Sequence, residues 1–200
     1  MNKKRKEMFE NLTKYHITLA SNSPRRRELL AGLGITFDIK VLPGIDESYP
    51  DNMPVSDIAK HIACKKAEAY RQAMQTDDLI ITADTVVIVD SEVLGKPADA
   101  QQACSMLHKL SGRTHQVVTG VCLTTQQRLK AFSVSTDVSF KPLSDDEIRY
   151  YVENYRPYDK AGAYGIQEWI GYIGVTALNG SYFNVMGLPV QRIYTELSAF

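Results

Sequence analysis

Residues 79–89 read LIITADTVVIV, a nearly continuous apolar run within this 200-residue chain. A run of this length without regular alternation is typical of a strand that is buried on both faces at the centre of a sheet. Asp84 interrupts the run. An ionised carboxylate in such surroundings costs free energy unless it is paired, hydrogen-bonded or bound to a metal. Asp84 is therefore either a structural side chain with a buried hydrogen bond or a functional one that projects from the strand into a cleft.

Patterns typical of strands and helices alternate on both sides of this run. Further strands are expected over residues 16–20, 36–42, 114–125 and 129–141. Helices are expected from Pro24, over 55–74 and 99–110, from Ser144 to about Asn154, and from about Leu188. The period-two alternation of 129–141 favours a half-buried antiparallel hairpin with 114–125, and Ser144 and Glu147 form a capping box. The chain is thus expected to be a mixed α/β protein.

The composition restricts the classes of partner. Lys plus Arg and Asp plus Glu both total 23, so the net charge of zero gives no overall attraction to nucleic acid or to an anionic membrane. Cys64, Cys104 and Cys122 are odd in number and lack metal-ligand spacing, so neither a structural disulfide nor a zinc site is expected. Residues 1–15 are basic but precede no continuous apolar segment, and are expected to form a polar extension, mobile or loosely helical. These features favour a reducing, cytoplasmic setting.

The stretch SNSPRRRELL, residues 21–30, places cations where a helix favours anions. Ser23 is a good N-cap and Pro24 suits the first helical position. Arg25, Arg26 and Arg27 therefore fall in the first turn, against the positive end of the helix dipole. A bound phosphate would turn this repulsion into charge-assisted hydrogen bonds. The alternative is that the arginines extend into solvent or pair with acidic side chains elsewhere.

Other charged residues stand at positions that need an explanation. Lys66 falls in the middle of the apolar half of the helix over 55–74, where it would extend to solvent, pair with Tyr70 or Glu47, or bind a phosphate. Lys96 lies in the rigid turn GKP and is either a fixed cation or a solvated one. Glu47 and Asp46, in the loop GIDE, are candidates for a second carboxylate beside the strand, although acidic loops are usually solvated. Together these groups suit a polyphosphate site that uses Mg²⁺ or a similar ion.

Eight motifs occur in the order found in the Maf family of nucleoside triphosphate pyrophosphatases, which the chain resembles from about His16 to its C-terminus. The motifs are LASNSPRRRELL, GIDE, KKA, ADTVV, GKP, LSGRTHQVVTG, DKAGAYGIQ and GSYFNVMGLP. The resemblance implies one catalytic domain over residues 16–200, with a mixed, strongly bent β-sheet flanked by helices and two lobes around a central cleft, as in inosine triphosphate pyrophosphatase-like folds. It also implies a cytoplasmic enzyme, often a homodimer.

The resemblance further implies roles for individual residues. Asp84 matches the position that activates water for attack on the α-phosphorus, and specificity positions are matched by Arg25, Thr85 and Gln167. Positions associated with metal and phosphates are matched by Glu47, Lys66 and Lys96. Our hypothesis is that Asp84 and Glu47 hold a divalent cation, Mg²⁺ or Mn²⁺, and that the triphosphate is held by Arg25, Arg26, Lys66 and Lys96. The residues leave open whether Asp84 is general base, metal ligand or both.

SPRR together with DKAGAYGIQ is similar to the branch of the family that acts on dTTP and UTP. The expected reaction is hydrolysis of these nucleotides, or of modified pyrimidine triphosphates, to the monophosphate and pyrophosphate. The amide of Gln167 offers a donor and an acceptor to the imide edge of thymine or uracil, but would suit other bases if turned over. The alternatives are a pyrophosphatase for other noncanonical nucleotides and a non-catalytic, nucleotide-sensing or division-related regulator. No nucleic-acid or membrane partner is expected.

Overall fold

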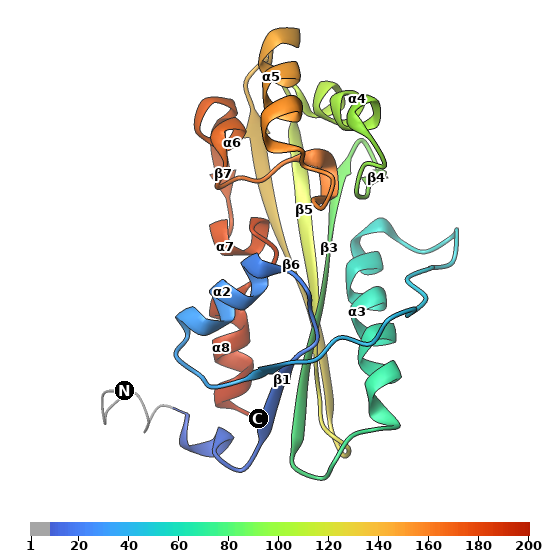
Figure 1. The fold of residues 1–200 in the computed structure, drawn as a ribbon, viewed down its shortest axis with the longest axis vertical. Coiled ribbons are helices and arrows are strands. Elements are labelled where there is room, and N and C mark those ends of the chain that lie inside the picture. The colour runs from blue at the N-terminus through green and yellow to red at the C-terminus, as the bar shows by residue number, and fades with distance from the viewer. Residues whose placement is uncertain (1–8) are drawn as a thin grey trace. The chain divides into compact units, whose positions relative to one another are not determined.

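The apolar run forms strand β3 (Asp78–Val89) of a seven-stranded mixed sheet, in a computed structural model that describes residues 9–200 (Figure 1). The strands run in the order β2-β1-β3-β5-β6-β7, and β4 pairs with β3. β3 is parallel to β1 and antiparallel to β4, which makes the sheet mixed. The other strands are β1 (His16–Leu19), β2 (Asp38–Ile39), β4 (Glu92–Leu94), β5 (Thr114–Thr124), β6 (Leu129–Phe140) and β7 (Val175–Asn179).

Helices flank the strands, so the predicted mixed α/β class is confirmed. The helices are α2 (Pro24–Gly32), α3 (Val55–Arg71), α4 (Ala100–Leu110), α5 (Asp145–Tyr155), α6 (Trp169–Gly174), α7 (Tyr182–Val185) and α8 (Val190–Ser198), with 3-10 turns η1 (Glu10–Leu12) and η2 (Ala161–Ala163). None of those in the described residues combines the length and the apolar character that crossing a bilayer needs. The expected strand over 36–42 is shorter than predicted, because only Asp38 and Ile39 pair with β1.

Contacts divide the chain into two compact units. Unit 1 holds the residues up to Asp84, Thr119–Val134 and Gly187–Phe200. Unit 2 holds Thr85–Val118 and Ser135–Met186. The division falls within β3, β5 and β6.

In unit 1 the core lies between the strands and three helices. Figure 1 shows α2 and α8 on one side of the strands of this unit and α3 on the other. The apolar half predicted for α3 is the half that is buried, with Ile58, Ala59, Ile62, Ala63, Ala67 and Tyr70 in the core. Gly120 of β5 lets α3 come close, because a Cβ there would lie 2.3 Å from backbone atoms of Ala59 and Lys60.

The segment expected to be a polar extension makes contacts with α8. Phe9 and Leu12 are buried, and the Phe9 ring packs edge-on against Tyr194 at 5.4 Å between centroids. Asn11 Nδ2 donates a hydrogen bond to Leu197 O at 2.8 Å. Residues 9–15 therefore belong to unit 1, while residues 1–8 of the expected extension lie outside the described residues.

Unit 2 has its own apolar core between α4, α5, α6 and the strands. His115 of β5 is buried in it, with its Nε2 at 2.7 Å from the Tyr164 hydroxyl and its ring edge-on to Phe140. Burial lowers the pKa of His115 to about 4, so the imidazole is neutral near pH 7. Val138 and Phe140 of β6 also point into this core, as the predicted alternation requires.

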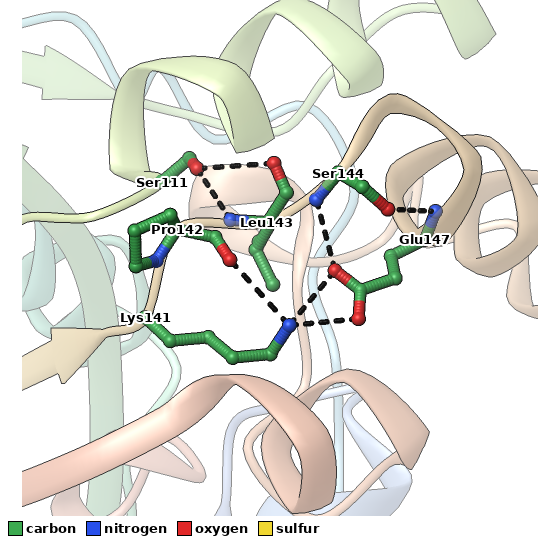
Figure 2. A network of polar contacts seen from close by, with 6 residues as sticks. All are labelled: Ser111, Lys141, Pro142, Leu143, Ser144 and Glu147. Atoms are coloured by element: carbon green, nitrogen blue, oxygen red, sulfur yellow. Dashed lines mark hydrogen bonds and ion pairs between the residues drawn. The ribbon is translucent and has the colours of Figure 1, made fainter.

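The connection from β6 to α5 carries the predicted capping box, which Figure 2 shows from close by. Ser144 Oγ accepts from Glu147 N at 3.2 Å, and the Glu147 carboxylate accepts from Ser144 N at 2.9 Å. Lys141 Nζ donates to the same carboxylate at 2.7 Å, and this bond lowers the pKa of Glu147. Ser111, at the end of α4, accepts from Leu143 N at 2.7 Å. The start of α5 is thus fixed from both sides.

Candidate active site

Asp84 is paired with a half-buried cation in unit 1. Lys66 Nζ lies 2.8 Å from Asp84 Oδ1 and 3.0 Å from Glu47 Oε1. The side chains of Lys66 and Asp84 are each 14% exposed, whereas that of Glu47 is 54% exposed. The pairing accounts for a carboxylate in an apolar strand, because an ion pair offsets the desolvation of both charges.

The structure removes two of the alternatives for Lys66, extension into solvent and pairing with Tyr70. Its ammonium does not extend to solvent; it bridges the carboxylates of the GIDE loop and of β3. Tyr70 makes other bonds, in which its hydroxyl donates to Lys40 O at 2.8 Å and accepts from Leu42 N at 2.9 Å. Lys66 is therefore the centre of a cluster that we call the Lys66 cluster, made of Lys66, Asp84 and Glu47.

Arg26, in the first turn of α2, is hydrogen-bonded to two backbone carbonyl groups beside this cluster. Its Nε donates to Gly187 O at 2.8 Å and its Nη1 donates to Ala83 O at 2.8 Å. Ser23 caps the helix as predicted, since its hydroxyl accepts from Arg26 N at 3.4 Å. Burial lowers the pKa of Arg26, and the charge of nearby Asp84 opposes that shift. The guanidinium thus lies next to the residue that precedes Asp84.

The three arginines of this turn differ in exposure. Arg25 and Arg26 are half-buried, whereas Arg27 is exposed. The alternative of arginines that simply extend into solvent therefore holds for Arg27 and fails for Arg26, which is bonded to two carbonyl groups. Sequence patterns gave no sign that Arg26 would bind backbone, because both acceptors are remote along the chain.

Two carboxylates of the Lys66 cluster are the candidate metal ligands. Within residues 9–200, no three His, Cys, Asp or Glu side chains are grouped to hold a metal ion by themselves. Mg²⁺ is commonly bound by one or two carboxylates together with substrate phosphates and water. Asp84 and Glu47 converge on one ammonium group, and carboxylate oxygens are ligands of the kind that Mg²⁺ takes. The donor set therefore fits a metal that is bound together with a phosphate.

The other predicted site residues belong to unit 2. Thr85 is half-buried and follows Asp84 directly, and Lys96 is exposed in the GKP turn, where Gly95 O accepts from Gly162 N at 3.0 Å. Gln167 is half-buried, and its Oε1 is a buried atom without a hydrogen-bond partner among the described residues. A buried amide oxygen without a donor is uncommon and indicates a place for one.

A network beside Gln167 was missed by the sequence reasoning. Lys160 Nζ lies 2.8 Å from Asp159 Oδ1 and 3.1 Å from Glu168 Oε1, with the Lys160 side chain 9% exposed. The Tyr151 hydroxyl donates to Glu168 and accepts from Gly165 N at 3.0 Å. These bonds hold the backbone on both sides of Gln167. The motif DKAGAYGIQ contains three of these residues, Asp159, Lys160 and Gly165, but nothing in its spacing indicated that they join one network.

The structure thus brings Arg26, Glu47, Lys66 and Asp84 together within unit 1. The strong bend of the sheet and the cleft between two lobes stay predictions, as do the joint roles of Arg25, Thr85, Lys96 and Gln167. Sequence had supplied all of these residues as candidates. It had not supplied the pairing of Lys66 with both carboxylates.

Comparisons with known proteins agree with the motifs. A protein named dTTP/UTP pyrophosphatase from Phocaeicola vulgatus is 63% identical over 190 residues, which are 95% of this chain and 98% of that protein. A protein of the same name from Parabacteroides distasonis is 58% identical over 193 residues, 96% of this chain and 100% of that protein. Among solved structures, a HAM1 protein from Coxiella burnetii is 18% identical with a TM-score of 0.49, over 93% of this chain and 100% of that one. The family model described as Maf-like protein matches residues 16–200, and the chain therefore belongs to the Maf-like protein family.

Proposed function

We propose that this chain hydrolyses dTTP and UTP to the nucleoside monophosphate and pyrophosphate. The observation that carries the proposal is the convergence of Asp84 and Glu47 on the half-buried Lys66 side chain. Such a cluster offers anionic and cationic groups to a triphosphate and its counter-ion. The choice of nucleotide is supported by the relatives at 63% and 58% identity, both of which are named dTTP/UTP pyrophosphatase.

Asp84 is proposed as the general base. The bond from Lys66 occupies Oδ1, and Oδ2 of the same carboxylate is the atom that accepts a proton from water. The water oxygen attacks the α-phosphorus, the bond from that phosphorus to the bridging oxygen breaks, and pyrophosphate leaves. Lys66 holds the Asp84 side chain in place, so that the base does not have to be ordered during the reaction.

The negative charge of the triphosphate requires cations. In unit 1 the positive charge comes from Lys66, Arg25 and Arg26. In unit 2 it comes from Lys96. Asp84 and Glu47 would hold a divalent cation, Mg²⁺ or Mn²⁺, and when bound this ion supplies neutralisation of the phosphate charge. In this proposal residues 16–200 work as one catalytic domain whose partner is the nucleotide.

Gln167 is proposed to recognise the base, together with Arg25 and Thr85. The imide N–H of thymine or uracil donates a hydrogen bond, and Gln167 Oε1 is a buried acceptor without a donor among the described residues. Cytosine has no proton at this ring nitrogen and would leave the oxygen unsatisfied. A site built to bond a particular donor rejects analogues that lack it.

The experiment is pyrophosphate release from dTTP, UTP, CTP and purine triphosphates, with Mg²⁺ or Mn²⁺ and with a chelator. Asp84→Asn is expected to lower turnover of dTTP and UTP by about 10²–10⁴-fold, the usual contribution of a general base. The matched control is Asp90→Asn, which removes an exposed carboxylate that pairs with Arg113 in unit 2 and is expected to leave turnover unchanged.

Three outcomes would contradict the proposal. Substantial activity in Asp84→Asn would remove the assigned base. A preference for purine or noncanonical triphosphates would replace the substrate. Binding of dTTP without metal-dependent hydrolysis by the unaltered chain would favour a nucleotide sensor.

A further inference from the structure

Two cysteines of unit 1 lie against each other and take no part in the proposed reaction. Cys64 of α3 is half-buried and Cys122 of β5 is fully buried, and both are free thiols. They belong to one small apolar cluster with Ala63, Ala67 and Ala131. The thiol of Cys64 is therefore partly accessible to solvent, whereas the neighbouring thiol of Cys122 is not.

The close approach of α3 to β5 explains why the two thiols meet. The absent side chain of Gly120 leaves β5 in contact with the α3 backbone at Ala59 and Lys60. Cys122 lies two residues beyond Gly120 and so faces the same side of the strand. Cys64 lies four residues beyond Lys60, about one helical turn further along α3. Both cysteines therefore lie in the contact between α3 and β5, a short distance along each element from the place where Gly120 meets α3.

Thr82 of β3 contacts the backbone of both α3 and β5 near the two cysteines. Its hydroxyl donates to the carbonyl oxygen of Ala63, the residue before Cys64, at 2.7 Å. The same hydroxyl lies 3.5 Å from the carbonyl oxygen of Cys122. One buried side chain is therefore bonded to the backbone beside Cys64 and lies against the backbone of Cys122.

The environment of Cys64 favours its reactive form. A hydrogen bond from Cys122 lowers the pKa of the Cys64 thiol to about 7, with burial acting against the shift and the Lys60 charge adding to it. The same contact raises the pKa of Cys122. Near neutral pH Cys64 is thus partly a thiolate, which is the nucleophilic form of cysteine.

We propose that Cys64 and Cys122 form a reversible dithiol pair that hydrogen peroxide converts to a disulfide. The Cys64 thiolate attacks one peroxide oxygen, the O–O bond breaks, and hydroxide leaves a sulfenic acid on Cys64. The Cys122 sulfur then attacks Cys64 Sγ, the S–O bond breaks, and the S–S bond forms. The hydroxide that leaves takes up the Cys122 proton to give water. Two electrons pass from the two thiols to the peroxide, and a dithiol reductant reverses the change.

The test is peptide mapping by mass spectrometry of the whole chain before and after peroxide. The expected product is a linked pair of peptides that contain Cys64 and Cys122, about 2 Da lighter than the two reduced peptides together, since two hydrogens are lost. Dithiothreitol is expected to restore both free peptides. The readout is mass, so it holds whatever nucleotide the chain hydrolyses.

Two variants and one internal control complete the test. Cys122→Ser keeps a hydrogen-bond donor beside Cys64 but cannot form a disulfide, so it is expected to leave Cys64 as a sulfenic acid that a dimedone probe captures. Cys64→Ser is expected to abolish the linkage. Cys104 of α4 is the control, because burial raises its pKa and it lies in unit 2. No linked peptide in the unaltered chain, or oxidation of Cys104 before Cys64, would overturn the proposal.

Discussion

Lys66 pairs with two carboxylates of unit 1, those of Asp84 and Glu47. Lys66→Ala removes the partner of Asp84, which is only 14% exposed, and leaves two negative charges side by side. We expect a loss of about 1–3 kcal/mol in the free energy of unfolding, the cost of an unpaired and partly buried charge. Pyrophosphate release is expected to fall as well. Urea unfolding and the nucleotide assay measure the two effects.

Lys65→Ala is the matched control for this prediction. Lys65 precedes Lys66 in α3 and pairs with Asp46 at 2.7 Å, but the Asp46 side chain is 68% exposed. Exposed ion pairs contribute about 0–1 kcal/mol, so the free energy of unfolding of this variant is expected to be close to that of the unaltered chain. Equal losses for the two lysines would contradict the role given to the Lys66 cluster.

His115 makes the stability of unit 2 depend on acid. Its folded-state pKa is lowered to about 4 from an ordinary value of 6.5, because its ring is buried. Between these values the unfolded chain binds a proton that the folded chain does not, so stability falls as the pH decreases from about 6.5 to about 4. The loss amounts to about 3 kcal/mol at most.

His115→Phe is expected to flatten this pH dependence, even though it also removes the bond to Tyr164. The measurement is the free energy of unfolding at several pH values from 7 to about 4. His108→Gln, at an exposed position of α4, is the control and should keep the slope. An unchanged slope in His115→Phe would show that other groups carry the acid response.

At the scale of elements, the contact between α3 and β5 depends on the absence of one side chain. Gly120→Ala would place a Cβ 2.3 Å from the α3 backbone, which has no flexible group to yield. We expect a loss of about 1–3 kcal/mol, as for other overpacked cores. Gly32→Ala is the control, since a Cβ there meets nothing within 4 Å. Thermal unfolding of both variants tests the prediction, and equal melting temperatures would contradict it.

Sequence patterns predicted elements well where the signal was local. The capping box of Ser144 and Glu147, the N-cap at Ser23 and the apolar half of α3 each depend on residues a few positions apart. β2 was overestimated because a short edge strand is defined by pairing and not by its own side chains. Helix ends shifted by a few residues, which is usual for frayed last turns.

At the scale of the whole molecule, the motifs predicted the family and the sheet but not the pairing within the site. Family membership over residues 16–200 followed from eight motifs in order. The partners of Lys66 come from β3 and from the GIDE loop, 18 and 19 positions away along the chain. Such distances, and the network of Lys160 and Glu168, depend on tertiary packing, for which the sequence carries no periodic signal.

The two bonds of Arg26 have a kinetic consequence. The Arg26 side chain binds Ala83, 57 positions further along the chain, and Gly187, 161 positions further along. Its bonds therefore form only after these distant segments have come together. Contacts of such long range are expected to be absent from the folding transition state. Arg26→Lys should then accelerate unfolding and leave the refolding rate nearly unchanged, a difference that stopped-flow measurements resolve. The first turn of α2 would thus make its contacts with the rest of unit 1 late in folding, after the transition state.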